Sequence, residues 1–173
     1  MKKVLLVLAL AFSGIALNAQ TKVAHINSQA LLDTLQSRKD AMAKLKKFEA
    51  EGVEELQEMQ KSFETAYVRY QQGQADMSPV IKKMEEEKLM KKQQALETRQ
   101  QELEQQMQIY GQELNKPILE LVQSAVNNVA EKEKISYVLD ETVTLYFKGN
   151  GAMDITSKVM TELLKLEAEL MGK

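Results

Sequence analysis

The chain has 173 residues, with 23 basic and 25 acidic side chains, one histidine and no cysteine. The slight negative charge offers no concentrated basic face, so we expect no nucleic-acid partner. Without cysteine there are no disulfides and no thiolate ligands, and one histidine supports neither a metal site nor a nucleophile and base pair. We therefore expect no cofactor and no enzymatic activity.

The N-terminus is typical of a secretory signal peptide. Two lysines follow the first methionine, and the apolar run Val4–Leu17 comes next. The small residue Ala19 suits cleavage after it. The run falls short of the ~20 apolar residues that span a bilayer, so we expect residues 1–19 to be removed. Residues 20–173 then form a single exported domain.

A short β-type run, Lys22–Asn27, precedes Ser28, which is suited to cap a brief helix. From residue 36 onward, apolar or small residues recur at coiled-coil spacing with one four-residue insertion. They are Ala41, Leu45, Phe48, Gly52, Leu56, Met59, Phe63, Ala66 and Tyr70. This stripe predicts a long helix whose other faces meet solvent.

Gly73 is suited to end this helix, and Ser78 and Pro79 to cap and begin the next. The second helix carries two rows at seven-residue spacing: Leu89, Leu96, Leu103, Tyr110 and Gln93, Gln100, Met107, Leu114. The two helices are similar in length and can lie antiparallel. The pattern predicts a helical arm over residues 36–116, roughly 50 Å long at ~1.5 Å per residue.

Three positions of these rows are poor coiled-coil residues. Gly52, Gln93 and Gln100 stand where leucine would pack best. Gly52 also costs ~1 kcal/mol of helix propensity relative to alanine. Two interpretations stay open: a tolerated defect, or an arm that is flexible.

Beyond Pro117 the apolar stripe widens, which indicates that the chain enters a compact body. The stripe consists of Ile118, Leu119, Leu121, Val122, Ala125, Val126 and Val129. Two strands are predicted next, Ile135–Leu139 and the alternating Thr142–Phe147, joined by a turn at Asp140 and Glu141. Asp154 is suited to cap a last helix, whose apolar stripe is Ile155, Val159, Leu163, Leu166 and Leu170.

The predicted fold class is therefore α+β and mostly α: a long antiparallel helical hairpin inserted in a small β-rich body. The body comprises residues 20–35 and 117–173. So few short strands bury little apolar surface, and the body would be marginal alone. We expect it to oligomerise through apolar strand residues, namely Val23, Ile26, Val138, Val143, Leu145 and Phe147.

Five segments of the chain, taken in order, resemble the Skp/OmpH family of periplasmic chaperones. They are Lys22–Gln29, the hairpin rich in Gln, Lys and Glu, Ile135–Asp140, Val143–Tyr146 and Asp154–Thr156. The resemblance covers essentially the whole chain after the signal segment. It implies a homotrimer in which a β-rich body joins three subunits. It also implies an ATP-independent holdase in the periplasm, whose three arms enclose a cavity for unfolded outer-membrane proteins.

Apolar side chains in the outer half of the arm are candidates for client contact. They are Met59, Phe63, Tyr67, Tyr70, Met77, Ile81 and Met84. Met and Tyr adapt to varied apolar partners, although coiled-coil packing is a competing explanation for Met59, Phe63 and Tyr70. The tip, Gln71–Asp76, carries almost no positive charge. This argues against binding to lipopolysaccharide or a membrane surface, which the resemblance alone would imply.

The alternative function is a structural coiled-coil protein of the cell envelope that tethers or spaces partners. It predicts a uniform, tight seam between the helices and specific folded partners. His25 has too few potential co-ligands for a metal site. The neighbouring carboxylates Asp140 and Glu141 are best explained by the preference of turns for aspartate.

Overall fold

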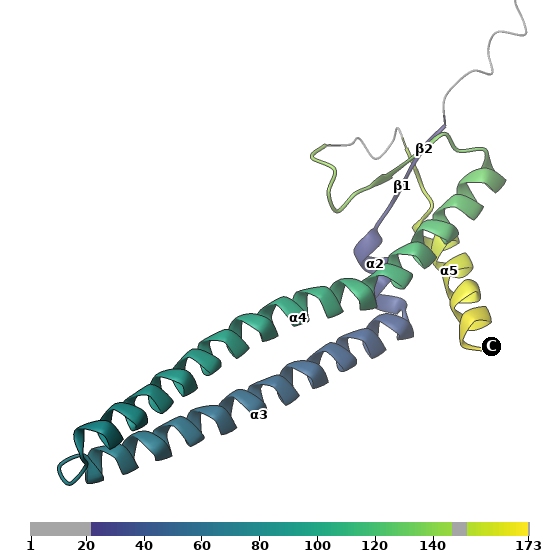
Figure 1. Cartoon of the computed structure of the whole chain (residues 1–173). Helices are drawn as coiled ribbons and strands as arrows, with labels where there is room; N and C mark the ends of the chain where they lie inside the picture. The colour runs from purple at the N-terminus through teal and green to yellow at the C-terminus, as the bar shows by residue number, and fades with distance from the viewer. Residues whose placement is uncertain (1–21, 147–151, 173) are drawn as a thin grey trace, which may run out of the picture. The chain divides into compact units, whose positions relative to one another are not determined.

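The computed structural model describes residues 22–146 and 152–172; the predicted signal peptide (1–19) and Phe147 lie outside them. The elements in chain order are β1 (Val23–Ile26), α2 (Ser28–Thr34), α3 (Gln36–Gly73), α4 (Pro79–Glu133), β2 (Tyr137–Asp140), β3 (Met153–Asp154) and α5 (Thr156–Met171) (Figure 1). The chain divides into two compact units. Unit 2 is Gln36–Ile118, and unit 1 combines the segments before and after it. The mostly α, α+β fold class with a long helical hairpin is confirmed.

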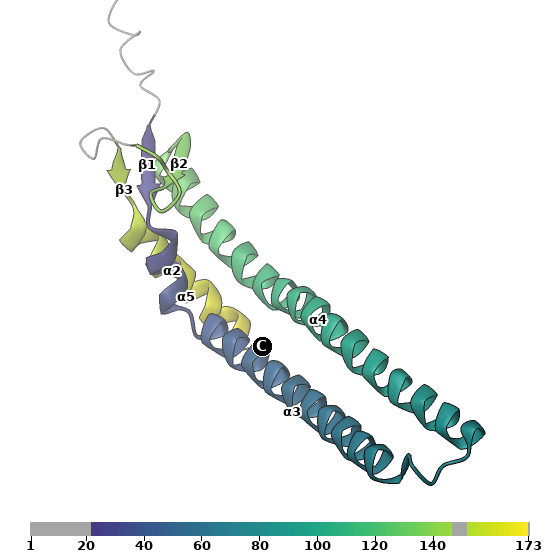
Figure 2. The ribbon, with the colours of Figure 1, turned by 90° about the vertical axis from the view of Figure 1, so that its left-hand side faces the viewer.

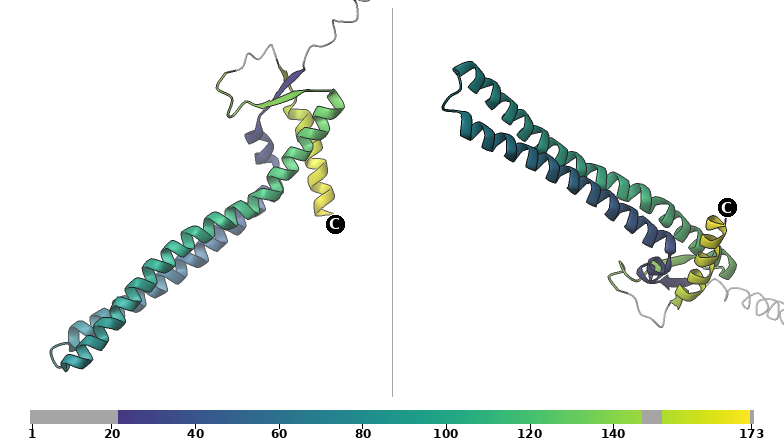
Figure 3. Two further views of the ribbon diagram at one scale, coloured as in Figure 1. Left: turned by 45° about the horizontal axis from the view of Figure 1, so that its top comes forward. Right: turned by 90° about the horizontal axis from the view of Figure 1, so that it is seen from below.

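Unit 2 is an antiparallel hairpin of α3 and the first two thirds of α4 (Figure 3). At its tip, α3 ends at Gly73, whose carbonyl accepts a hydrogen bond from the Asp76 amide at 3.1 Å. Pro79 is the first helical residue of α4, and the Ser78 hydroxyl accepts a hydrogen bond from the Ile81 amide at 3.4 Å. Both predicted helix boundaries at the tip are thus confirmed.

The predicted stripe of α3 is the face that packs on α4. From Lys39 to Gln72, each of its nine residues is buried or half-buried and every other residue is exposed. On α4 the row of Leu89, Leu96, Leu103 and Tyr110 is likewise turned away from solvent. Gln93 and Gln100, however, are exposed, so their predicted place in the seam is wrong.

Gly52 is buried against Leu103, which is 5% exposed. A Cβ atom at Gly52 would lie 2.3 Å from Leu103 Cδ1 and 3.1 Å from its Cγ. The glycine therefore provides the space that the leucine of the opposite helix fills. The prediction that Gly52 weakens the packing is wrong, because the missing side chain is replaced by Leu103.

Unit 1 contains a parallel sheet with β1 in the centre, β2 on one side and β3 on the other (Figure 2). Parallel neighbours require long crossover connections, and α3 with α4 supplies the one between β1 and β2. Helix α5 packs against α2 and β1. The fully buried side chains of unit 1 are Ala24, Leu31, Leu35, Ala125, Ile155, Val159 and Leu163.

The predicted strand at Thr142–Phe147 is not formed in its described part, residues 142–146. The Asp140 side chain accepts hydrogen bonds from the Thr142 amide at 3.0 Å and the Thr142 hydroxyl at 2.9 Å. The Asp140 carbonyl accepts from the amides of Val143 and Thr144. These bonds turn the chain back on itself, as aspartate side chains commonly do, and the alternating residues lie outside the sheet.

Smaller corrections concern helix ends and stripe edges. Asn27, one residue before the predicted Ser28, caps α2 by accepting a hydrogen bond from the Ala30 amide at 2.8 Å. Asp154 lies in β3 and accepts from the Thr156 amide, while Ile155 occupies the cap position of α5. Leu119 and Leu170, predicted in apolar stripes, are 57% and 60% exposed.

Candidate functional site

Contacts across the hairpin hold the two helices in one register from base to tip. The pairs are Leu45 and Gly111, Phe48 and Tyr110, Gly52 and Leu103, Glu55 and Arg99, Ser62 and Lys92, and Tyr70 and Glu86. The ring centroids of Phe48 and Tyr110 are 5.2 Å apart. The inner contacts are apolar or aromatic, whereas the outer ones are polar.

The change in character begins at Arg99, which takes the inward position that Gln100 was predicted to hold. Its guanidinium donates to Glu55 Oε2 at 2.7 and 3.0 Å and to Gln106 Oε1 at 3.2 Å. The hydrogen bond from Arg99 lowers the pKa of the Glu55 carboxyl. At this position a charged pair replaces the leucine that a uniform coiled coil would have.

Tyr70 closes the seam near the tip. Its side chain is buried and its hydroxyl donates to Glu86 Oε1 at 2.6 Å. The hydrogen bond to Glu86, with the burial of the ring, raises the pKa of Tyr70 to about 12. Tyr70 as described thus offers little surface to a partner.

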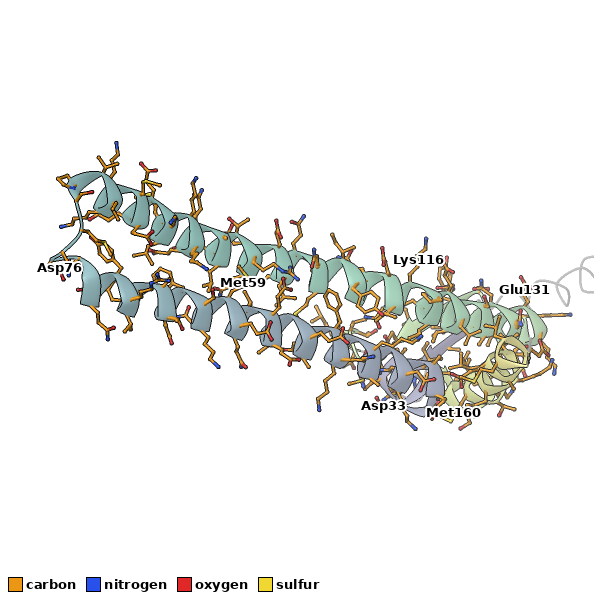
Figure 4. All side chains as sticks on the ribbon, turned by 60° about the horizontal axis from the view of Figure 1, so that its bottom comes forward. Asp33, Met59, Asp76, Lys116, Glu131 and Met160 are labelled. Atoms are coloured by element: carbon orange, nitrogen blue, oxygen red, sulfur yellow. The ribbon has the colours of Figure 1, made fainter. Side chains whose placement is uncertain are left out.

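The other predicted client residues are more accessible. Tyr67, Ile81 and Met84 are 46%, 50% and 52% exposed, whereas Met59, Phe63 and Met77 are half-buried. Phe63 and Tyr67 stack with ring centroids 6.2 Å apart. Figure 4 shows the side chains along both helices, with Asp76 in the loop at the tip and Met59 on the outer half of α3. The outer arm therefore displays apolar side chains beside its seam.

Unit 1 has a second apolar surface, an open groove of about 510 Å³ between the sheet and α4. Its apolar lining includes Ile26, Leu119, Val122, Val126, Ile135 and Val138. Of the predicted interface residues, Ile26 is buried, Val23 and Val138 are half-buried, and Val143 and Leu145 are fully accessible or nearly so. Phe147 lies outside the described residues.

His25 is buried in the central strand. Its Nδ1 lies 3.1 Å from Glu141 Oε2, and the side-chain Nδ2 of Asn27 donates to the other oxygen of that carboxylate at 2.6 Å. In the part of the chain that the structure describes, no three His, Cys, Asp or Glu side chains gather as metal ligands would. None of its helices has the length and apolar content needed to cross a membrane.

A sequence model of the family described as outer membrane protein (OmpH-like) matches residues 22–163. This chain belongs to the OmpH-like family. The resemblance inferred from the sequence is thereby confirmed.

A solved structure from Caulobacter crescentus CB15, of a candidate outer-membrane chaperone (OmpH-like), has a similar fold. The TM-score is 0.71 over 87% of this chain and 86% of that chain, at 17% sequence identity. None of the curated proteins matches the chain.

In this OmpH-like chain, several exposed apolar residues escaped the prediction from sequence. In unit 2 they are Val68 and Val80; in unit 1 they are Tyr137, Leu139 and Tyr146. Val68 lies outside the predicted stripe of α3, so its exposure could have been predicted from the sequence, whereas Val80 precedes the rows predicted on α4. Tyr137 and Leu139 alternate with Val138 along β2, so their exposure depends on which face of the strand is covered.

Proposed function

We propose that this protein is an ATP-independent chaperone of the periplasm that holds unfolded outer-membrane proteins between the arms of a homotrimer. Membership of the OmpH-like family and the fold of the Caulobacter crescentus protein support a chaperone role. The observation that carries the proposal is the exposed apolar set on the outer arm, Tyr67, Ile81 and Met84, beside a seam that is complete without them.

These side chains suit weak and reversible binding. Each is about half exposed, so covering it with an apolar client segment contributes on the order of 1 kcal/mol. Several such contacts add to a useful affinity, and each breaks easily, so release requires no ATP. Methionine and tyrosine also fit segments of varied shape, as unfolded β-barrel chains would present.

Trimer formation is proposed through unit 1. A threefold assembly joins two different patches of neighbouring subunits. The groove lined by Ile26, Val122 and Val138 is one candidate patch, and the exposed Val143 and Leu145 are the other. Packing one against the other would cover apolar surface that a single chain leaves in water.

The uneven seam favours the chaperone over a structural tether. A tether requires a uniform coiled coil, yet the charged pair of Arg99 and Glu55 stands in the seam. Export to the periplasm is proposed on the basis of the family and the signal segment predicted at residues 1–19.

Site-specific photocrosslinking tests the proposed client surface. A photoreactive residue at Tyr67 or Ile81 is expected to crosslink to an outer-membrane β-barrel protein diluted from denaturant. The same β-barrel protein, already folded in detergent, serves as the control and should not crosslink. Equal crosslinking to both forms, or recovery of one folded envelope protein in place of unfolded precursors, would instead support the tether.

A further inference from the structure

We propose that Met84 and Met90 form a peroxide-sensitive modification site, at which oxidation makes the outer arm more polar and leaves the fold intact. The consequence for client holding rests on the proposed function. The chemistry and the effect on the surface do not depend on it.

The placement of methionine in this chain is unusual. Methionine is normally among the residues most often buried, yet none of the nine described methionines is buried. The cores of both units are built instead from Leu, Ile, Val, Ala and one Tyr. In the part of the chain that the structure describes, oxidation of methionine therefore places no sulfoxide in a core.

Met84 and Met90 are 52% and 68% exposed on the outer part of α4. Met84 follows Val80 and Ile81 by four and three residues, so helical geometry places the three side chains together. The pairs Ser62 with Lys92 and Tyr70 with Glu86 set Met90 level with the turn of α3 that carries Phe63. Met84 thus belongs to the apolar surface of the outer arm, and Met90 exposes its thioether on the same part of α4.

The oxidation is a two-electron transfer of oxygen from a peroxide. The thioether sulfur attacks one peroxide oxygen, an S–O bond forms and the O–O bond breaks. The proton of the transferred oxygen passes to the departing hydroxide, which leaves as water, and methionine becomes the sulfoxide. The sulfoxide is polar where the thioether was apolar, so an apolar segment placed against it loses favourable burial. No cysteine in the chain competes for the oxidant.

Peptide mass spectrometry after timed exposure to hydrogen peroxide tests the site. Met84 and Met90 are expected to oxidise faster than Met59 and Met107, which are half-buried in the seam. The thermal unfolding midpoint should stay unchanged while Met84 and Met90 become oxidised. Oxidation of Met59 or Met107 at the same rate, or unfolding in step with oxidation, would overturn the proposal.

Binding of a hydrophobic fluorescent dye and of an unfolded β-barrel protein is then measured. Each oxidised variant is compared with its own untreated sample. Oxidation of the wild-type chain should weaken both interactions roughly three- to tenfold, as expected for losing the burial of one or two side chains. The double variant Met84→Leu, Met90→Leu should lose neither. Met42→Leu, which removes an exposed methionine at the inner end of α3, should respond like wild type.

The outcomes separate this proposal from the proposed function. Peroxide that weakens dye binding equally in the double variant and the wild type would overturn the modification site. Dye binding that responds as expected, in a chain that never holds unfolded protein, would retain the site and reject the chaperone.

Discussion

Tyr70 ties the two helices together close to the tip of the hairpin. The phenol is a donor to the Glu86 carboxylate, and its ionisation would place two negative charges side by side. The pKa of Tyr70 is raised from 10.0 to about 12 for this reason and because the ring is buried. A raised pKa in the folded state means that the stabilisation is fully present below pH 10 and is lost as the pH rises through about 12.

The Tyr70→Phe variant tests this contact. Wild type should be more stable than the variant at neutral pH, and the difference should shrink as the pH rises from about 10 towards 12. Thermal unfolding at a series of pH values measures it. Tyr67→Phe is the matched control, because Tyr67 is exposed and its hydroxyl accepts a hydrogen bond from Gln71 on the same helix. A stability difference for Tyr70→Phe that does not depend on pH would contradict the assignment.

Within the hairpin, packing depends on where the two helices come close. Gly52 and Gly111 both face the other helix, but a Cβ at Gly52 would lie 2.3 Å from Leu103 whereas one at Gly111 would lie 3.7 Å from Leu45. Alanine is favoured over glycine in a helix by ~1 kcal/mol at either site. Only at Gly52 does a clash oppose this gain.

Gly111→Ala should therefore stabilise the protein by roughly 0.5–1 kcal/mol. Gly52→Ala should be less stable than Gly111→Ala by about 1–3 kcal/mol, because the added methyl overpacks a buried contact. Urea unfolding of the two variants at one protein concentration gives the comparison. Equal stabilisation by both substitutions would show that Leu103 moves aside freely.

The helices were predictable from sequence because one local signal repeats many times. Nine stripe positions between Ala41 and Tyr70 each repeat the same spacing, and Gly73 with Pro79 marks the turn. The role of Gly52 was not predictable, since it depends on a leucine some fifty residues away. A periodic pattern identifies the inward face but not which partner fills each position.

The sheet was less predictable because its pairing is not local. Thr142–Phe147 alternates like a strand, yet the side chain of Asp140 forms a turn that ends β2. The partner of β2 is β1, more than a hundred residues earlier, and β3 has two residues. Of the candidate site, Tyr67 lies off the predicted stripe of α3, so its exposure could be predicted. The rows predicted on α4 begin at Leu89, so they did not indicate which face carries Ile81 and Met84.

At the scale of the whole molecule, the two units leave different surfaces open. Unit 1 contains the groove and exposes Tyr137, Val143, Leu145 and Tyr146, and unit 2 exposes apolar side chains along the outer arm. A single chain keeps both in water, which is costly at roughly 25 cal/mol per Å² of apolar area. We propose that other copies of the chain cover the first surface and that unfolded protein covers the second.

The proposed function requires a trimer that binds unfolded outer-membrane protein. An unfolded β-barrel protein is diluted, without ATP, into a solution of the chain comprising residues 20–173. Light scattering on a size-exclusion column then measures the mass of each species, and this measurement tests the proposal most directly. We expect one soluble species with the mass of three chains plus client, and a mass of three chains when client is left out. A single-chain mass, with the β-barrel protein lost to aggregation as in buffer alone, would contradict it.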